Sequence, residues 1–369
     1  MIPSWYTSQD ADIRVGGIFH YEQAIELGKY CEIAIFFPFD KMLRQEFSQG
    51  KEAGVLTFRC KFVPSDRIRN RIRMFKAFTS IVKQFKPDLV HAHVATEAGR
   101  YAAIWCSYYK IPFIVTEHAT VEISGVSHGL AHAYGKYTYG KSKRNVCVSE
   151  DLQKKLHMIY PRYQFETIYN GIKIPEEISE HVSYKIEDKI NIGIVALLYD
   201  KEIKGLQFLF QALQLLCKEG YLIQLHIIGG GEYLNYFQAL SKEDGIANNV
   251  IFYGTCEKQK VYEILSDMDM CVSSSIVESF GCGIAEALLL GNPVVATKCG
   301  GPEGFVNSKV GELVDKGDVT ALKEGIKSVI TKLDRYDRNE ISRYARNIFD
   351  NTIICQKYLR IYQDVLYHE

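Results

Sequence analysis

The chain has 369 residues, enough for two domains of ordinary size. Lysine plus arginine equals aspartate plus glutamate at 44 each, so net charge gives no reason to expect nucleic-acid binding. Ten cysteines are scattered without a Cys-x-x-Cys pair, which predicts reduced thiols in a cytoplasmic protein and excludes a disulfide or zinc framework. We expect no secretory signal and no membrane span, because no apolar run approaches the roughly 20 residues that cross a bilayer.

Predicted strands alternate with predicted helices along the whole chain, which favours parallel sheets covered by helices. The first strand is unusually short, because Ile2 is nearly all that precedes Pro3. We therefore expect that the true start lies upstream. A polar segment then ends in Gly16-Gly17, ahead of a helix over residues 19–29. A plain turn and a ligand-binding loop are about equally good interpretations of this glycine pair.

A basic segment follows two strands expected at residues 32–38 and 55–63. Ile68, Ile72, Phe75 and Phe78 recur at helical spacing within residues 66–86, and arginines fill the positions between them. The segment from Arg59 to Lys86 contains nine basic residues and one acidic residue, which predicts a basic surface. One interpretation is a solvated helix whose apolar side packs on its own sheet. The other is attraction to an anionic membrane, at about 1 kcal/mol for each basic residue near the surface. The two interpretations are compatible.

Two further strands, at residues 87–93 and 112–118, carry histidines near their carboxyl ends. Ligands of open α/β sheets bind at that edge, and His118 is the best placed because it closes its strand. His91 lies within its strand and is interpreted as a core residue, while the role of His93 stays open. We expect no metal site from these three histidines, because no cluster of carboxylates or cysteines accompanies them.

The composition changes between the two halves of the chain. The strand near residue 168 ends in a turn at Asn170-Gly171, and residues 173–189 are charged and contain little apolar periodicity. This pattern predicts a first domain over residues 1–172, a linker over residues 173–189 and a second domain over residues 190–350. Residues 351–369 are expected to form a C-terminal amphipathic helix.

The second domain repeats a strand–turn–helix unit with glycines in the turns. Lys201 and Lys204-Gly205 follow its first strand, and Gly231 ends a glycine run that permits either close ligand approach or a tight turn. Asp267-Met268-Asp269 matches a metal-binding signature, but its position between a helix and a strand favours a capping role.

The most informative stretch joins a strand to the helix expected at residues 281–290. The first amides of a helix lack intrahelical partners and attract anions, and glycines let a ligand approach the backbone. Two carboxylates beside such amides suggest a nucleotide-sugar, with amides for its phosphates and carboxylates for its hydroxyls. The candidate residues of this stretch are Glu278, Ser279, Phe280, Gly281, Gly283 and Glu286.

Glu278 through Glu286 resembles the Glu-x7-Glu motif of GT4-like retaining glycosyltransferases, also called glycosyltransferase group 1. Four other features occur in the same order as in that family: Gly16-Gly17, His118, Asn170-Gly171 and Lys204-Gly205. The resemblance covers nearly the whole chain. It implies the GT-B fold, in which two Rossmann-like doubly wound domains face each other across a cleft and a C-terminal helix crosses back to the first domain.

The resemblance also implies roles for single residues. Glu278, His118 and Lys204 would be the catalytic residues, with His118 contacting the donor sugar and Glu286 holding the ribose. The remaining residues expected to bind the donor are Gly16, Gly17, Lys201, Gly231, Tyr253, Ser279, Phe280, Gly281 and Gly283. The family also has a phosphate-binding arginine after the first strand of the second domain, where this chain has Leu197 or Leu198.

The predicted function is transfer of a sugar from a nucleotide-sugar, expected to be a UDP-sugar, with retention and without a metal or other cofactor. The basic segment favours a lipid-linked saccharide acceptor at the inner face of the cytoplasmic membrane, as in polysaccharide or lipopolysaccharide assembly. Two alternatives stay open. One is a different enzyme on the same fold, such as a nucleotide-sugar epimerase or a phosphorylase. The other is a non-catalytic subunit that binds a nucleotide-sugar.

Overall fold

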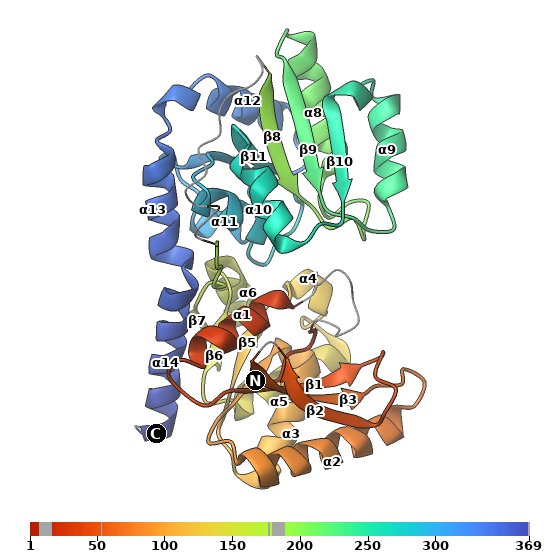
Figure 1. Cartoon of the computed structure of the whole chain (residues 1–369), viewed down its shortest axis with the longest axis vertical. Coiled ribbons are helices and arrows are strands. Elements are labelled where there is room, and N and C mark those ends of the chain that lie inside the picture. Colours follow the sequence, from red (N-terminus) through yellow and green to blue (C-terminus); the bar gives the residue numbers. More distant parts are fainter. Residues whose placement is uncertain (7–16, 53, 176–177, 179–188, 368–369) are drawn as a thin grey trace. The chain divides into compact units, whose positions relative to one another are not determined.

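The computed structural model describes residues 1–6, 17–52, 54–175, 178 and 189–367. It divides the chain into two compact units (Figure 1). Unit 1 comprises Met1–Gly171 and Asn351–Glu369, and unit 2 comprises Ile172–Asp350. The boundary is one residue earlier than the sequence indicated, because Ile172 pairs with Asp350. Most of the expected linker, residues 173–189, lies outside the described residues.

Unit 1 contains two sheets, of strand order β1-β3-β2 and β4-β5-β6-β7, and all pairs are parallel except β2 with β3. The sequence did not predict β2, because its residues are polar and lack the apolar alternation of a half-buried strand. The strands are β1 (Ala34–Asp40), β2 (Phe47–Glu52), β3 (Val55–Lys61), β4 (Val90–His93), β5 (Phe113–Glu117), β6 (Asn145–Cys147) and β7 (Glu166–Thr167).

The short N-terminal segment lies between these two sheets. The Met1 carbonyl accepts a hydrogen bond from the backbone of Phe36 in β1, at 2.9 Å. Ile2 pairs with Ala92 of β4, and the His93 amide donates to the Ile2 carbonyl at 3.0 Å. Met1 and Ile2 therefore connect the two sheets through backbone hydrogen bonds.

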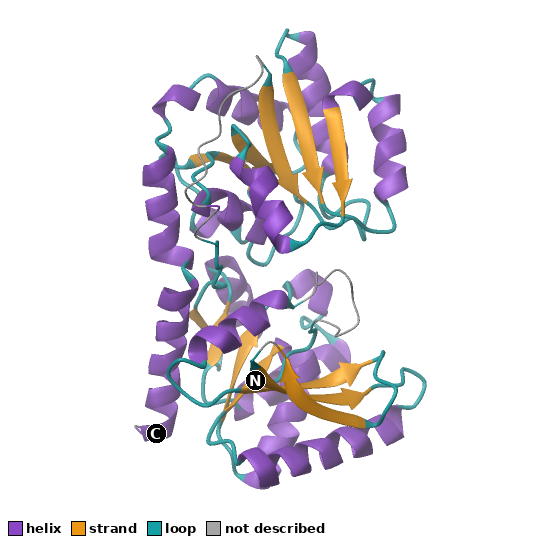
Figure 2. Ribbon diagram, viewed as in Figure 1, coloured by secondary structure: helices purple, strands orange, loops and turns teal. Residues whose placement is uncertain are grey.

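Helices cover the sheets of unit 1 (Figure 2). C-terminal helix α14 packs against α1 and contributes Ile354, Tyr358 and Ile361 to a core that includes Ile114 of β5. The helices are α1 (Ile18–Leu27), α2 (Arg67–Phe85), the π-helical turn η1 (Val94–Gly99), α3 (Arg100–Tyr109), α4 (Val121–Ser124), α5 (Gly129–Lys141), α6 (Glu150–Ile159) and α14 (Asn351–Tyr367).

Helix α2 packs differently from the sequence prediction. Phe78 is buried as expected, but Ile68 and Ile72 are 74% and 51% exposed. Met74, Ala77 and Ile81 complete the buried side instead. The helix therefore presents two isoleucines to solvent among its arginines.

Arg59 lies in the core rather than on the basic surface. Its side chain is 1% exposed, and its guanidinium donates to Asp40 at 2.8 Å and to both carboxylate oxygens of Glu52 at 2.7 Å. Tyr6 and Phe37 lie against the same group, at 5.2 and 5.9 Å from their ring centroids. Burial lowers the pKa of Arg59, but the two carboxylates more than offset this effect and raise it. The ion pairs hold β1, β2 and β3 together.

Arg59→Ala should destabilise unit 1 by about 3–5 kcal/mol, because Asp40 and Glu52 are left without their cation in a buried place. Urea unfolding of the full chain, followed by circular dichroism, measures the loss. Arg69→Ala is the matched control, since Arg69 is 80% exposed and its change should cost under about 0.5 kcal/mol. Equal losses in the two variants would contradict the buried network.

Unit 2 is built on a parallel sheet of strand order β10-β9-β8-β11-β12-β13 (Figures 1 and 2). Apolar residues of the strands and of α8 form its largest core cluster. The strands are β8 (Ile190–Val195), β9 (Ile223–Ile228), β10 (Val250–Gly254), β11 (Met270–Ser273), β12 (Val294–Thr297) and β13 (Gly311–Val314). The helices are α8 (Leu206–Lys218), α9 (Leu234–Glu243), α10 (Lys258–Ser266), α11 (Cys282–Leu289), α12 (Val319–Ile330) and α13 (Arg338–Phe349).

The strand order of unit 2 reverses between β8 and β11. From β8 the chain adds β9 and β10 on one side, and from β11 it adds β12 and β13 on the other. The loops that leave β8 and β11 therefore diverge at their carboxyl ends, which is where open α/β sheets bind their ligands. Within the described residues, the helices are too short or too polar to cross a membrane.

Candidate active site

Two charged side chains meet where the strand order of unit 2 reverses. Lys204 belongs to the loop after β8, and Glu278 belongs to the loop after β11. The Lys204 ammonium lies 2.5 Å from Glu278 Oε1, and the side chains are 21% and 17% exposed. The pair is thus mostly shielded from water yet reachable at the edge of the sheet.

The environment of Lys204 favours its charged form. Burial lowers the pKa of Lys204, but the Glu278 carboxylate more than offsets this effect and the pKa is raised. The Ser275 hydroxyl donates to the same Glu278 oxygen at 2.9 Å. Lys204 is therefore a cation held in place by Glu278, whose carboxylate is in turn held by Ser275.

The backbone fixes the position of both residues. Gly205 follows Lys204 with a φ of 60°, and a Cβ there would lie 2.0 Å from the Ser274 carbonyl oxygen. The Ser274 hydroxyl donates to the Lys204 carbonyl at 2.8 Å. Only glycine allows this approach, so the Lys204-Gly205 pair is required by packing as well as by charge.

The Glu278 loop is tied to the loop after β12. The Glu278 amide donates to the Cys299 carbonyl at 3.0 Å, and the Gly301 amide donates to the Glu278 carbonyl at 3.1 Å. The Gly300 amide in turn donates to both oxygens of Glu303. The carboxylate of Glu278 is thus presented by a loop that is anchored on both sides.

Helix α11 begins directly after this loop. Gly281 precedes it with a φ of 95°, which favours glycine, and the first amides of α11 have no intrahelical partners. Gly283 is explained by packing, because a Cβ there would lie 2.9 Å from the Val195 Cβ of β8. Phe280 is buried against Phe305 and Phe349, so only its backbone can serve a ligand, and Ser279 is half-buried.

Glu286 lies one turn further along α11 and is half-buried. The Tyr262 hydroxyl of α10 donates to Glu286 Oε1 at 3.4 Å. The two motif glutamates therefore belong to one connected segment, with Glu278 before the helix and Glu286 within it.

The structure distinguishes the two leucines at the expected arginine position. Leu198 is fully buried in the core, whereas Leu197 is 44% exposed after β8. Of the two, only Leu197 presents its side chain to solvent. The Lys201 ammonium lies over the rings of Tyr236 and Tyr233, at 4.6 and 5.3 Å from their centroids.

The glycine run after β9 packs on protein backbone. A Cβ at Gly231, where φ is 153°, would lie 2.3 Å from the Leu198 carbonyl oxygen. The Tyr233 amide donates to that same carbonyl at 3.0 Å. The tight-turn interpretation therefore explains Gly231. Tyr253 of β10 is 37% exposed, and its hydroxyl lies 2.9 Å from His226 Nδ1.

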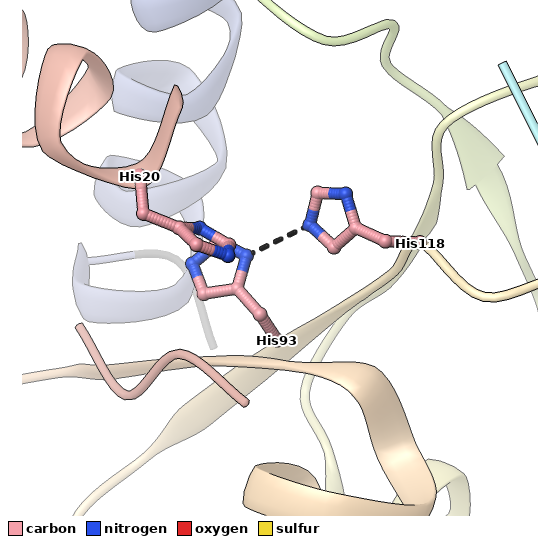
Figure 3. Close-up of side chains that lie close together, drawn as sticks. All are labelled: His20, His93 and His118. Atoms are coloured by element: carbon pink, nitrogen blue, oxygen red, sulfur yellow. Dashed lines mark hydrogen bonds between the residues drawn. The ribbon is translucent and has the colours of Figure 1, made fainter. Parts of the chain in front are cut away.

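In unit 1, the carboxyl ends of β4 and β5 bring His93 and His118 together (Figure 3). His93 Nδ1 lies 3.0 Å from His118 Nε2, and both side chains are buried. Burial lowers the pKa of His118 to about 3, with the Asn170 side chain acting in the opposite direction. Burial also lowers the pKa of His93 well below its usual range. Both rings are therefore neutral near pH 7.

Glu117 holds the loop that carries His118. Its Oε1 accepts hydrogen bonds from the amides of His118 and Ala119, at 3.1 and 3.0 Å. Its Oε2 accepts from the Ala95 amide at 3.0 Å and the Tyr139 hydroxyl at 2.9 Å. Burial raises the pKa of Glu117, and the four donors act in the opposite direction. Because each oxygen accepts from two donors, the pattern is that of an ionised carboxylate.

Other candidates of unit 1 fall outside this cluster or outside the described residues. His91 is a core residue as expected, since its ring nitrogens lie 2.7 Å from the Tyr362 hydroxyl and 2.8 Å from the Thr116 hydroxyl. Gly17 precedes α1 with a φ of 72°, and a Cβ there would lie 2.7 Å from the Trp5 carbonyl oxygen. Gly16 lies outside the described residues.

Asp267 and Asp269 have the capping role that the sequence favoured. Asp267 is the residue that ends α10, and Asp269 accepts a hydrogen bond from the Asn191 amide at 2.8 Å. A separate cavity of about 350 Å³ in unit 1 is lined by Glu32, Leu89 and residues of α14. It lies at the amino ends of β1 and β4, opposite the edge that carries His93 and His118.

Sequence reasoning missed two contributors. Ser275 was not a candidate, although its position three residues before Glu278 in a serine run was a usable signal. His20 was also not a candidate, yet its ring lies 4.2 Å from that of His93 and 5.4 Å from that of His118. Nothing in the spacing of His20 indicated this contact, because it depends on how α1 packs.

Glu117→Gln should destabilise unit 1 by about 2–4 kcal/mol. The glutamine NH₂ group is a hydrogen-bond donor, and in this buried position it would face two of the donors that now bind the carboxylate. Thermal and urea unfolding of the full chain measure the change. Glu122→Gln in the following helix is the matched control, since the Glu122 side chain is 50% exposed and should cost under about 0.5 kcal/mol. A Glu117→Gln variant as stable as the control would contradict the role of Glu117 as a loop anchor.

Two family models match consecutive parts of the chain. Residues 21–174 match the model described as Glycosyltransferase Family 4, and residues 177–348 match the model described as Glycosyl transferases group 1. The chain belongs to the GT4-like glycosyltransferases of group 1. The resemblance seen in the sequence motifs is thereby confirmed.

Named relatives and solved structures agree with this membership. The chain is 26% identical to protein CapJ of Staphylococcus aureus over 313 residues, which is 82% of this chain and 77% of CapJ. It is 24% identical over 374 residues to a putative teichuronic acid biosynthesis glycosyltransferase, TuaC, of Bacillus subtilis, covering 91% and 89% of the two chains.

The fold matches that of Alr3699/HepE of Anabaena in complex with UDP-glucose. The TM-score is 0.74 at 20% identity, and the match covers 98% of this chain and 99% of the other. At this identity the likeness establishes the fold, which is the two-domain GT-B fold that the sequence predicted.

Proposed function

We propose that this glycosyltransferase transfers a hexose from a UDP-sugar to a saccharide or lipid-linked saccharide acceptor, with retention of configuration. The observation that carries the proposal is the half-buried Lys204–Glu278 pair at the reversal of strand order in unit 2. A cation beside helix amides suits a diphosphate, and a carboxylate beside them suits sugar hydroxyls.

The leaving nucleoside diphosphate gains negative charge as the glycosidic bond breaks. In this proposal Lys204 and the first amides of α11 stabilise that charge, because fixed donors need no reorganisation during the reaction. No metal or other cofactor is assigned to the step. Glu278 would then be released from Lys204 to bind the sugar hydroxyls, and Glu286 would bind the ribose hydroxyls.

Retention requires the acceptor to attack from the face that the leaving group occupies. We assign no covalent nucleophile, so the sugar passes through an oxocarbenium-like state while the acceptor and the diphosphate share one face. His118 stays predicted to contact the donor sugar. Lys201, Gly231 and Tyr253 stay predicted to line the donor site of unit 2.

UDP is the proposed nucleotide because a structural relative was solved in complex with UDP-glucose. A cell-surface polysaccharide is the proposed product because TuaC is named for teichuronic acid biosynthesis. Leu197 stands where the family has an arginine. Lys204 would therefore neutralise more of the negative charge of the diphosphate in this chain than in relatives that have both residues.

Lys204→Ala and Glu278→Gln should each reduce transfer from the donor by at least about 100-fold, comparable to the loss of one oxyanion donor. A coupled assay for released nucleoside diphosphate, run across UDP-, GDP- and ADP-sugars, measures the rate. Lys298→Ala and Asp315→Ala are the matched controls, because this exposed ion pair in the same unit should leave the rate unchanged.

Transfer at the wild-type rate in either site variant would exclude the assignment. Incubation with the donor alone separates the alternative enzymes, because an epimerase converts the donor and a transferase needs an acceptor. A non-catalytic subunit would bind UDP in calorimetry yet turn over none of the donors with any acceptor.

The exposed surface of α2 suits contact with an anionic membrane. Arg67, Arg69 and Arg71 are exposed there together with Ile68 and Ile72, so cations and apolar side chains share one surface. Interfacial helices bind in this way, through apolar insertion and attraction to anionic headgroups. We propose a peripheral position at the inner face of the cytoplasmic membrane, which would bring the enzyme to a lipid-linked acceptor.

Changing Arg67, Arg69 and Arg71 to glutamate should abolish cosedimentation with phosphatidylglycerol vesicles at low salt, because it removes about 1 kcal/mol of attraction per residue. The charge-matched control changes Lys136, Lys141 and Lys154, which are exposed on α5 and α6. The control should bind like the wild-type protein. Absence of wild-type binding, or an equal loss in the control, would exclude this surface as the docking site.

A further inference from the structure

Three buried histidines of unit 1 converge at the carboxyl ends of β4 and β5 (Figure 3). His20 comes from α1, His93 ends β4, and His118 follows β5. One ring nitrogen from each lies within 4.8 Å of those of the other two. His20 is 0% exposed and His93 is 1% exposed, so the cluster is shielded from solvent.

Several of these ring nitrogens lack a hydrogen-bond partner among the described residues. They are both nitrogens of His20, Nε2 of His93 and Nδ1 of His118. A buried polar atom without a partner costs about 1–3 kcal/mol, and such atoms in native proteins call for a missing ligand or water. His20, which has no partner at either ring nitrogen, is difficult to explain by packing alone.

The cluster has the chemistry of a metal site. A ring nitrogen that carries no hydrogen can offer a lone pair to a metal ion, and the three rings come from three separate elements.

We propose that His20, His93 and His118 bind a divalent transition-metal ion, of which Zn²⁺ is the best match. Imidazole nitrogen is a preferred ligand of zinc, copper, nickel and cobalt, whereas magnesium and calcium prefer oxygen. Three protein ligands leave one tetrahedral position open for water. The proposed transfer step itself is assigned no metal, although His118 is also the residue predicted to contact the donor sugar.

Metal binding requires only small movements of the three histidine rings. His93 Nδ1 and His118 Nε2 already lie 3.0 Å apart, close to the roughly 3.3 Å between two nitrogens on a tetrahedral zinc with bonds of about 2.0–2.1 Å. His20 completes the set by moving toward them on the order of 1 Å, which a small side-chain rotation provides. The metal would replace the hydrogen bond between His93 and His118.

The proposal is tested by titrating the full-length, tag-free protein with Co²⁺ alone and recording its visible absorption. Wild-type protein should give the intense d–d bands of a four-coordinate site, with no thiolate charge-transfer band. Zn²⁺ should then displace the Co²⁺ with a stoichiometry of one ion per chain. No d–d bands, or bands accompanied by thiolate charge transfer, would overturn the assignment.

His20→Ala should weaken Co²⁺ binding by at least about 100-fold, because it removes a ligand. Removing a residue that only hydrogen-bonds to a ligand already lowers metal affinity by about 10- to 100-fold. His157→Ala is the matched control, because His157 is exposed on α6 and lies outside the cluster. Circular dichroism confirms that each variant is folded. Equal affinity in His20→Ala and His157→Ala would overturn the proposal.

A ligand exchange keeps the test informative if His20→Ala does not fold. His20→Cys should retain one Co²⁺ per chain and add a thiolate-to-cobalt charge-transfer band, because sulfur enters the coordination shell. Binding without that band would place the ion elsewhere. These measurements use no donor sugar, so their outcome is independent of whether the proposed transfer reaction is correct.

Discussion

The parallel pairing of β8 with β11 is the constraint on which the site of unit 2 depends. These strands are neighbours in space but are separated in the chain by β9 and β10. Their carboxyl ends lie side by side, and the loops that follow carry Lys204 and Glu278 to within 2.5 Å. The pairing creates the place where a cation, a carboxylate and the start of α11 meet. A nucleotide-sugar offers the complementary groups, since its phosphates are anionic and its sugars carry hydroxyls.

Glycines in this region serve packing as much as ligand binding. Because Gly205 and Gly231 have no side chain, the carbonyl groups of Ser274 and Leu198 can pack closely against them. Gly283 in the same way lets α11 pack closely against Val195. The same close contacts position Lys204 and the amides of α11. A substitution at these glycines would therefore displace the site rather than simply block a ligand. In the proposed function, Leu197 stands where the family has an arginine, so Lys204 would be the main cation beside the diphosphate.

Unit 1 uses buried charge and buried imidazole in a different way. Arg59 joins three strands through Asp40 and Glu52, so it contributes to stability and not to the basic surface. Glu117 anchors the loop of His118 through four neutral donors. The neighbouring histidine cluster contains buried ring nitrogens that have no hydrogen-bond partner among the described residues. In our proposals, this edge of the sheet carries both the histidine predicted to contact the donor sugar and the ligands of a metal ion.

The sequence by itself determined the family, the alternation of strands and helices, and the motif from Glu278 to Glu286. It did so because these features are local: periodicity, glycines in turns and the spacing of two carboxylates are all readable along the chain. Tertiary structure decided that Arg59 is buried, that Ile68 and Ile72 are exposed, and that polar β2 forms a strand. It also decided that Ser275 supports Glu278 and that His20 joins His93 and His118. These outcomes depend on which elements pack together, and side chains far apart in the sequence carry no local signal of their meeting.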